Sequence, residues 1–246
     1  MARFVILSGP SCVGKGPLFA ALARFYPDQA AHLRHLILYN SRAPRPGETD
    51  GVDYHFRTRR QVERLRDHDG FLVIDVRGDL QALDLEGLSQ AGAAGDVFFE
   101  GNPFVVEKLL ARGLPKELEK LSVFLAPLSR AEILYLRAPE RNLSLPDFVA
   151  ALMRRKLLRR TTRQRTHLSL PDLQDIERRA TSAYVEMQQA WRFDFVIPNH
   201  DGEDSDHWDA LYYPVGDARR TLLTFVELLA GGTPADAERW DEDLLP

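Results

Sequence analysis

Short apolar runs alternate with amphipathic stretches of helical spacing along most of this chain. The apolar runs are bounded by polar or turn residues and are predicted as strands at 3–8, 36–40, 52–56, 71–76, 96–100, 121–125 and 193–197. The stretches predicted as helices span 16–25, 58–67, 103–112, 130–137, 146–160, 171–191 and 217–230. Strands that alternate with helices predict an α/β fold, in which a parallel sheet is flanked by crossover helices.

A glycine-rich turn lies between the first predicted strand and the first predicted helix. Its residues are Gly9, Pro10, Ser11, Cys12, Val13, Gly14, Lys15 and Gly16. Glycines let the backbone curl so that successive N–H groups point at phosphate oxygens, and the helix N-terminus adds a positive dipole end. Lys15 adds a mobile charge for the outer phosphates. Strand, glycine turn, lysine and helix together predict a phosphate-binding loop rather than a chance turn.

The loop departs from the usual pattern immediately after its lysine. A serine or threonine hydroxyl normally follows and holds Mg²⁺, but here Gly16 and Pro17 follow. Pro17 suits a first helical turn, where a missing N–H costs little. Mg²⁺ would therefore have to bind through water, through nucleotide oxygens or through a carboxylate elsewhere, and its ligands stay unassigned.

Bulk composition narrows the classes of protein. The 246 residues are 44% apolar and 28% charged, with a net charge of −4, which is ordinary for a globular protein. No apolar run reaches the ~20 residues that span a bilayer, and the chain opens on a predicted strand, so neither a membrane segment nor a signal peptide is expected. Cys12 is the single cysteine, which excludes a disulfide framework within one chain and favours a cytoplasmic location. Cys12 is either a small residue facing the ligand or a redox-sensitive thiol activated by the helix N-terminus.

A second motif follows the strand predicted at 36–40. Arg42 and Arg45 lie three residues apart on a loop stiffened by prolines, which makes a fork for an anionic group. Glu48 is placed to hold an arginine, and Tyr54 offers a hydroxyl. On spacing alone, an exposed basic loop without function is an equally good interpretation.

Both motifs, in this order and spacing, resemble those of the guanylate kinases. The resemblance is strong over residues 1 to about 60 and weaker beyond. It implies an adenylate-kinase-like P-loop NTPase fold with a monophosphate-binding insertion and a lid, and transfer of the γ-phosphoryl group of ATP to GMP with Mg²⁺. The implied parts are a core (1–32, 94–138, 173–232), an acceptor-binding insertion (33–93), a lid region (139–172) and a C-terminal tail (233–246), which we expect to be frayed.

The resemblance also implies roles for individual residues. Lys15, Arg42 and Arg179 are the expected catalytic residues, with Arg179 neutralising the transferring group. The loop residues Gly9, Ser11, Cys12, Val13, Gly14, Lys15 and Gly16 are expected to bind ATP. The expected acceptor-binding residues are Arg42, Arg45, Glu48, Tyr54 and Glu100, the last standing where the family has an aspartate.

Guanine-reading positions of the family do not match. Leu38 stands where the family has a serine, and Val73 where it has the glutamate that pairs with the guanine edge. Gln81 and Leu83 replace a tyrosine and a serine. Unless the alignment is shifted, phosphate gripping is retained while guanine reading is lost, since buried polar edges need partners. Polar residues of the same segment, Asp75, Arg77 and Asp79, are alternative readers of a different acceptor.

The lid region and the turn after the last predicted strand are unusually charged. Residues 154–165 carry seven positive charges and no negative one, and we expect two or three of them to face the nucleotide and the others to be solvated. The acidic stretch 199–207 is read as a turn rather than a metal loop.

Three further functions stay open. The first is a P-loop kinase of a different phosphorylated small molecule. The second is a non-catalytic guanylate-kinase-like module that recognises phosphopeptides, which the missing hydroxyl keeps open although Lys15 remains. The third is nucleic-acid binding through 154–165, which is disfavoured because aromatic residues are not interleaved there.

Overall fold

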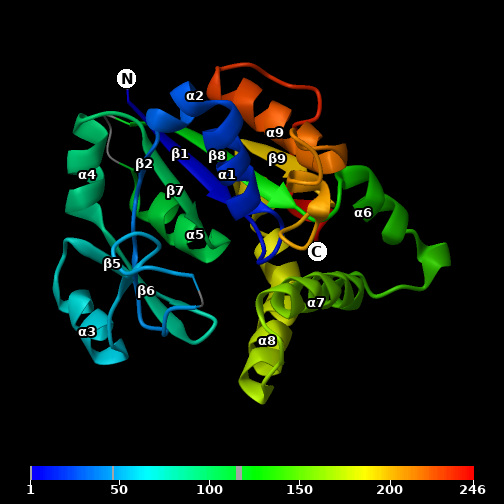
Figure 1. The fold of residues 1–246 in the computed structure, drawn as a ribbon, viewed down its shortest axis with the longest axis horizontal. Coiled ribbons are helices and arrows are strands. Elements are labelled where there is room, and N and C mark those ends of the chain that lie inside the picture. Colours follow the sequence, from blue (N-terminus) through cyan, green and yellow to red (C-terminus); the bar gives the residue numbers. More distant parts are fainter. Residues whose placement is uncertain (1, 46, 115–117) are drawn as a thin grey trace. The chain divides into compact units, whose positions relative to one another are not determined.

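The computed structural model describes residues 2–45, 47–114 and 118–246 (Figure 1). The chain forms two compact units, one made of Met1–Ile6 with His32–Leu121 and the other of Leu7–Ala31 with Ser122–Pro246. The expected division into core, acceptor-binding insertion, lid and tail stays a prediction.

A five-stranded sheet contains the strand β1, which leads directly into the glycine-rich loop. Its strand order is β2-β7-β1-β8-β9, and the pairs β2–β7 and β8–β9 are parallel. The strands span Ala2–Ser8 (β1), Arg34–His35 (β2), Val97–Gly101 (β7), Leu118–Ala126 (β8) and Phe195–Pro198 (β9). Residues Phe4 to Leu7 of β1 are fully buried, as expected for an apolar run in the middle of a parallel sheet. The predicted α/β class is confirmed.

The first unit also contains a four-stranded sheet of order β4-β3-β6-β5. Its strands span Tyr39–Asn40 (β3), His55–Phe56 (β4), Phe71–Val76 (β5) and Asp79–Asp84 (β6). The β5–β6 hairpin turns at Arg77 and Gly78, whose φ angles of 58° and 90° suit a two-residue turn with both residues left-handed. The helix α3 (Arg59–Arg64) lies against one face of this sheet (Figure 1), where Val62 packs with Leu80 and Ala82.

Helices begin where the sequence supplies capping residues. Ser129 and Glu132 form a reciprocal capping box at α6, and Ser169 with Asp172 does the same at α8. Helices α7 and α8 pack against each other (Figure 1). The helices span Lys15–Phe25 (α1), Pro27–Ala31 (α2), Arg59–Arg64 (α3), Leu85–Ala93 (α4), Pro103–Arg112 (α5), Arg130–Leu136 (α6), Leu145–Gln164 (α7), Leu170–Met187 (α8) and Gly216–Leu229 (α9).

The C-terminal tail is ordered, so the expectation that it frays was wrong. Glu238 pairs with Val196 through two backbone hydrogen bonds of 2.7 and 2.8 Å, adding a bridge beside β9. Trp240, Leu244 and Leu245 of the tail are buried. Burial of three large apolar side chains offsets the entropy of ordering a terminal segment.

Within the described residues, no helix combines the length and the apolar character that crossing a bilayer requires.

Candidate functional site

The glycine-rich loop connects β1 to α1 and has no room for side chains at two of its glycines. Gly9 has a φ of 141°, and a Cβ there would lie 2.4 Å from the carbonyl oxygen of Leu125. Gly14 has a φ of 104°, and its Cβ would lie 2.6 Å from Asn199 Nδ2. Both positions therefore require glycine, and the curled backbone between them has the form that a phosphate chain needs.

Lys15 is the first residue of α1 and its side chain folds back over the loop. Its ammonium group donates hydrogen bonds to the carbonyl oxygens of Gly9 at 3.0 Å and Pro10 at 2.9 Å. The residue is only 9% exposed. A buried ammonium group held by two neutral carbonyls keeps its full charge for an anion that enters the loop.

The turn after β9 supports the loop from within the second unit. Asn199 is fully buried and donates from Nδ2 to the carbonyl oxygens of Val13 at 2.8 Å and Asp201 at 2.7 Å. A Cβ on Gly202 would lie 2.1 Å from the carbonyl oxygen of Cys12, so this turn packs directly on the loop. The sequence pattern identified the strand end but not this support, which arises only from tertiary packing.

Cys12 is an inert part of the loop. Its φ is 68° and it is fully buried. Burial, reinforced by the negative charge of Glu203, raises the pKa of the thiol to about 12. The thiol is therefore protonated at neutral pH, which disfavours the interpretation of Cys12 as a redox-sensitive residue.

The position directly after Lys15 provides no hydroxyl ligand for a metal ion, because Gly16 stands there. An ideal Cβ on Gly16 would meet no atom within 4 Å. In the described part of the chain, no three His, Cys, Asp or Glu side chains converge where they could hold a metal ion. The glycine-rich loop therefore retains its phosphate-binding backbone, and the ligands of Mg²⁺ stay unassigned.

Basic residues of α7 are largely paired with the acidic turn that follows β9. Lys156 is buried and its ammonium group lies 3.5 Å from Asp204. Arg160 lies 2.6 Å from Glu203, and its buried Nε forms no hydrogen bond with any of the described residues. Burial opposes the charged form of Arg160, but the nearby Glu203 carboxylate raises its pKa.

The other basic residues of 154–165 lie further out. The ion pairs Arg154–Glu177, Arg163–Asp206 and Arg165–Asp172 have side chains exposed by 38–48% on the arginine side. Such pairs contribute little to stability. Lys156 and Arg160 are therefore less exposed than Arg159 and Arg163, which also pair with the acidic turn. That lid arginines face the nucleotide stays a prediction.

His200 of the supporting turn lies between two carboxylates. Its Nε2 is 2.9 Å from Glu132, and its Nδ1 contacts Asp217. Burial alone would lower the pKa of His200, but the hydrogen bonds to Asp217 and Glu132 raise it. A raised folded-state pKa stabilises the protein below the unfolded value of about 6.5, and that stabilisation is lost as pH rises through the folded-state pKa.

We therefore expect His200→Gln to lower the melting temperature at pH 6 by about 1–2 °C, and by less at pH 9. The effect is small because the His200 side chain is 44% exposed. Thermal unfolding followed by circular dichroism across this pH range measures the difference. His32→Gln, at an exposed position, is the matched control. A loss of melting temperature in the His200 variant that grows as pH rises would contradict a raised pKa of His200.

Arg42 and Glu48 form a two-pronged ion pair in the acceptor loop of the first unit. Arg42 donates from Nη1 and Nη2 to the two Glu48 oxygens at 2.6 Å each, and the Arg45 N–H donates to the same carboxylate at 2.7 Å. Burial opposes ionisation of both side chains, yet the pair raises the pKa of Arg42 and lowers that of Glu48. The guanidinium group is thus fixed and charged, as gripping a phosphate requires.

Tyr54 lies among the other residues predicted to bind the acceptor. The Arg42 guanidinium lies 5.2 Å from the Tyr54 ring centroid. Burial raises the pKa of Tyr54, and the charges that act on it are those of Arg42, Glu100, Arg45 and Glu48. The five residues predicted to bind the acceptor therefore form one group within the first unit.

Arg179 lies on α8 in the second unit and is 3% exposed. Its Nη2 is 2.6 Å from Asp175 Oδ2, but neither Nε nor Nη2 forms a hydrogen bond in the described part of the chain. The neighbouring Arg178 takes the other Asp175 oxygen at 2.7 Å and is half-exposed. Nη2 is thus engaged by the Asp175 carboxylate, whereas the buried Nε is a donor left over for an incoming anion.

The four residues that stand where the guanylate kinases have acceptor-contacting side chains lie on different faces of the β3–β6 sheet. Val73 packs against the Val62 cluster on the α3 side, so it does not share a face with the others. Leu38 and Leu83 are buried and apolar. Gln81 is half-buried and is the polar member of the four.

Polar residues near the hairpin turn are partly engaged in local structure. Asp75 accepts the Gly78 N–H at 2.7 Å and pairs with Arg59 at 3.7 Å. Asp79 is among the charges that raise the pKa of Arg42, which places it beside the phosphate-gripping residues. Asp75 and Arg59 therefore stabilise the hairpin.

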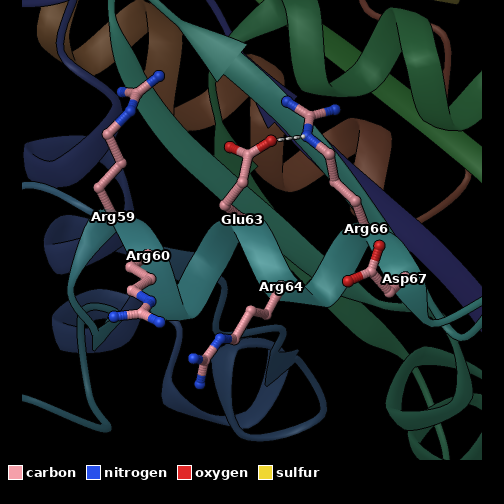
Figure 2. A pocket seen from close by; sticks show the side chains of 6 residues that line it. All are labelled: Arg59, Arg60, Glu63, Arg64, Arg66 and Asp67. Atoms are coloured by element: carbon pink, nitrogen blue, oxygen red, sulfur yellow. Dashed lines mark hydrogen bonds and ion pairs between the residues drawn. The ribbon is translucent and has the colours of Figure 1, made fainter.

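A shallow open pocket of about 710 Å³ lies along the outer side of α3 (Figure 2). Glu63 and Arg66 form an ion pair at 2.8 Å across it, and Arg66 also donates to the carbonyl oxygen of Val73. The pocket is lined by Arg59, Arg60, Glu63, Arg64, Arg66 and Asp67. These charged side chains surround a helix whose Val62 is buried against the sheet, so the pocket is the solvated side of a structural helix.

Comparison with known proteins agrees with both motifs. The family model described as guanylate kinase matches residues 1–77. A guanylate kinase of Mycobacterium sp. (strain MCS) is 37% identical over 61% of this chain and 73% of the relative. A guanylate kinase of Corynebacterium jeikeium (strain K411) is 34% identical over 81% of this chain and 89% of the relative.

A solved structure extends the likeness to the fold. The crystal structure of guanylate kinase from Anaplasma phagocytophilum matches with a TM-score of 0.55 at 17% identity, covering 95% of this chain and 88% of that one. At that identity the match concerns the fold alone, a parallel sheet with flanking helices. With the sequence relatives aligned over most of both chains, it follows that this chain belongs to the guanylate kinase family.

Proposed function

We propose that this protein transfers the γ-phosphoryl group of ATP to a nucleoside monophosphate, with GMP as the default acceptor. The proposal rests above all on the coexistence of two intact phosphate sites: the glycine cradle with Lys15 and the Arg42–Glu48 grip. The relatives named guanylate kinase support the choice of GMP.

The residues divide the task between donor and acceptor. The loop from Gly9 to Gly16 holds the ATP phosphates, and Lys15 neutralises the outer ones. Arg42, Arg45 and Tyr54 hold the acceptor phosphate, with Glu48 fixing Arg42 and Glu100 nearby. Phosphoryl transfer needs alignment, charge neutralisation and exclusion of water rather than covalent chemistry.

Mg²⁺ is expected to accompany the nucleotide, where it neutralises phosphate charge. Because Gly16 offers no hydroxyl, no step is assigned to a protein-bound metal ion. Since ATP is a cytoplasmic substrate, the proposal includes a cytoplasmic location.

The experiment measures ADP formation from ATP and Mg²⁺ in a coupled assay with GMP as the acceptor. AMP, CMP and UMP are tested as acceptors in parallel. Turnover with GMP is the expected result. Turnover with another phosphorylated small molecule alone would retain the kinase and replace its acceptor. Folded protein that turns over none of them would favour the non-catalytic module, which Gly16 keeps as the second candidate.

A further inference from the structure

The β3–β6 sheet carries two facing carboxamides on the side away from α3. Asn40 of β3 and Gln81 of β6 are direct partners in the antiparallel pairing. Their strand neighbours Tyr39 and Ala82 pack with the Val62 cluster. Because successive side chains of a strand point to opposite faces, Asn40 and Gln81 share the other face.

The same face carries the phosphate grip at one end and leucines at the other. Beyond β3 the backbone stays paired with β6, since the Ser41 N–H donates to the Leu80 carbonyl oxygen at 2.9 Å, and the Arg42 N–H bonds to Asn40 Oδ1 at 3.1 Å. On β6, Asp79 and Leu83 flank Gln81 on the same face. The face therefore runs from the charged pair Arg42 and Asp79, through the carboxamides, to buried leucines.

The carboxamides are available to a ligand. Asn40 is 1% exposed, and its Oδ1 accepts the Arg42 N–H at 3.1 Å. Across the described residues, neither Asn40 Nδ2 nor the Gln81 amide forms a hydrogen bond with another residue. The Asn40 Nδ2 donors and the half-buried Gln81 amide therefore have hydrogen-bonding capacity left for a ligand beside the phosphate grip. Because Oδ1 already accepts the Arg42 N–H, Nδ2 is the group of Asn40 with unused capacity on both of its hydrogens.

We propose, on the basis of the function proposed above, that Asn40 and Gln81 read the O6 and N1–H edge of the acceptor purine and leave its position 2 unread. Asn40 donates to O6, and Gln81 Oε1 accepts from N1–H. Guanine and hypoxanthine share this edge and differ in the 2-amino group. A carboxylate would accept from both N1–H and the 2-amino group. Gln81 offers an amide instead, and the next residue of β6 on the same face is Leu83.

The consequence is that IMP and GMP are accepted about equally well. Reading one shared edge gives no preference between the two nucleotides, and a 2-amino group next to leucine gains no partner. Discrimination between acceptors follows the groups that are read, whereas the phosphate grip contributes equally to all of them.

The test compares kcat/KM for GMP and IMP, with AMP and UMP alongside, in the whole protein and its Gln81 variants. The wild type is expected to favour GMP over IMP by no more than about threefold, and Q81E to raise the GMP-to-IMP ratio about tenfold or more by adding an acceptor for the 2-amino group. Q81L should weaken both nucleotides in parallel. Q90L, on the exposed side of α4, is the matched control.

A wild-type preference for GMP above about thirtyfold, a preference for AMP or UMP, or Q81L kinetics equal to wild type would overturn the proposal. Calorimetric titration of GMP and IMP without ATP separates this reading from the kinase proposal. If no nucleotide is turned over, equal binding of GMP and IMP that Q81L weakens still supports the carboxamide reading. Absence of binding to both nucleotides overturns it.

Discussion

Replacing Lys15 with alanine is expected to lower kcat/KM for phosphoryl transfer about 10³-fold. The ammonium group is held between the carbonyl oxygens of Gly9 and Pro10, so its charge is fixed within the loop before the nucleotide arrives. Charge that is already in place stabilises the transition state without reorganisation. The loss should appear in both kcat and the affinity for ATP, because the outer phosphates are charged in both states.

Steady-state kinetics with ATP varied, together with calorimetric binding of a non-hydrolysable ATP analogue, measure this effect. Lys108→Ala is the control, since that lysine side chain is 56% exposed. Circular dichroism establishes that the Lys15 variant is folded. A Lys15 variant with near-normal turnover would remove the phosphate loop from the proposed mechanism.

Local sequence patterns predicted several of the helices and strands. The strand 71–76 and the helix 103–112 occur as expected, because their signals, apolar runs and terminal caps, act within a few residues. The strand β6 and the helix α4 were missed. Asp79 and Asp84 interrupt the apolar pattern at both ends of β6, and its pairing with β5 and β3 overrides that weak local propensity.

Features that depend on pairing between distant segments could not be predicted from local sequence patterns. Asn40 had no distinguishing motif, and its position opposite Gln81 comes from the strand register. Alignment placed Val73 among the base-reading positions, whereas strand alternation turns it toward α3. A one-residue difference moves a strand side chain to the other face, and no sequence motif reports that face.

The buried guanidinium of Arg179 leads to the second large effect. Arg179→Lys is expected to lower kcat about 10²–10³-fold while leaving KM for ATP and for the acceptor nearly unchanged. Lysine keeps the charge but loses the planar fork, in which Nη2 pairs with Asp175 at 2.6 Å while the buried Nε has no hydrogen-bond partner in the described residues. Donors that engage only when phosphate charge moves affect kcat rather than ground-state binding.

Arg178→Lys is the matched control for this prediction. Both arginines contact Asp175 from the same helix, yet Arg178 is 49% exposed and Arg179 is 3% exposed. The control should therefore retain full turnover, while thermal unfolding of both variants detects any loss of stability. An Arg179→Lys enzyme with unchanged kcat, or one whose only defect is a raised KM, would assign Arg179 to binding or to packing of α8 instead of the transfer step.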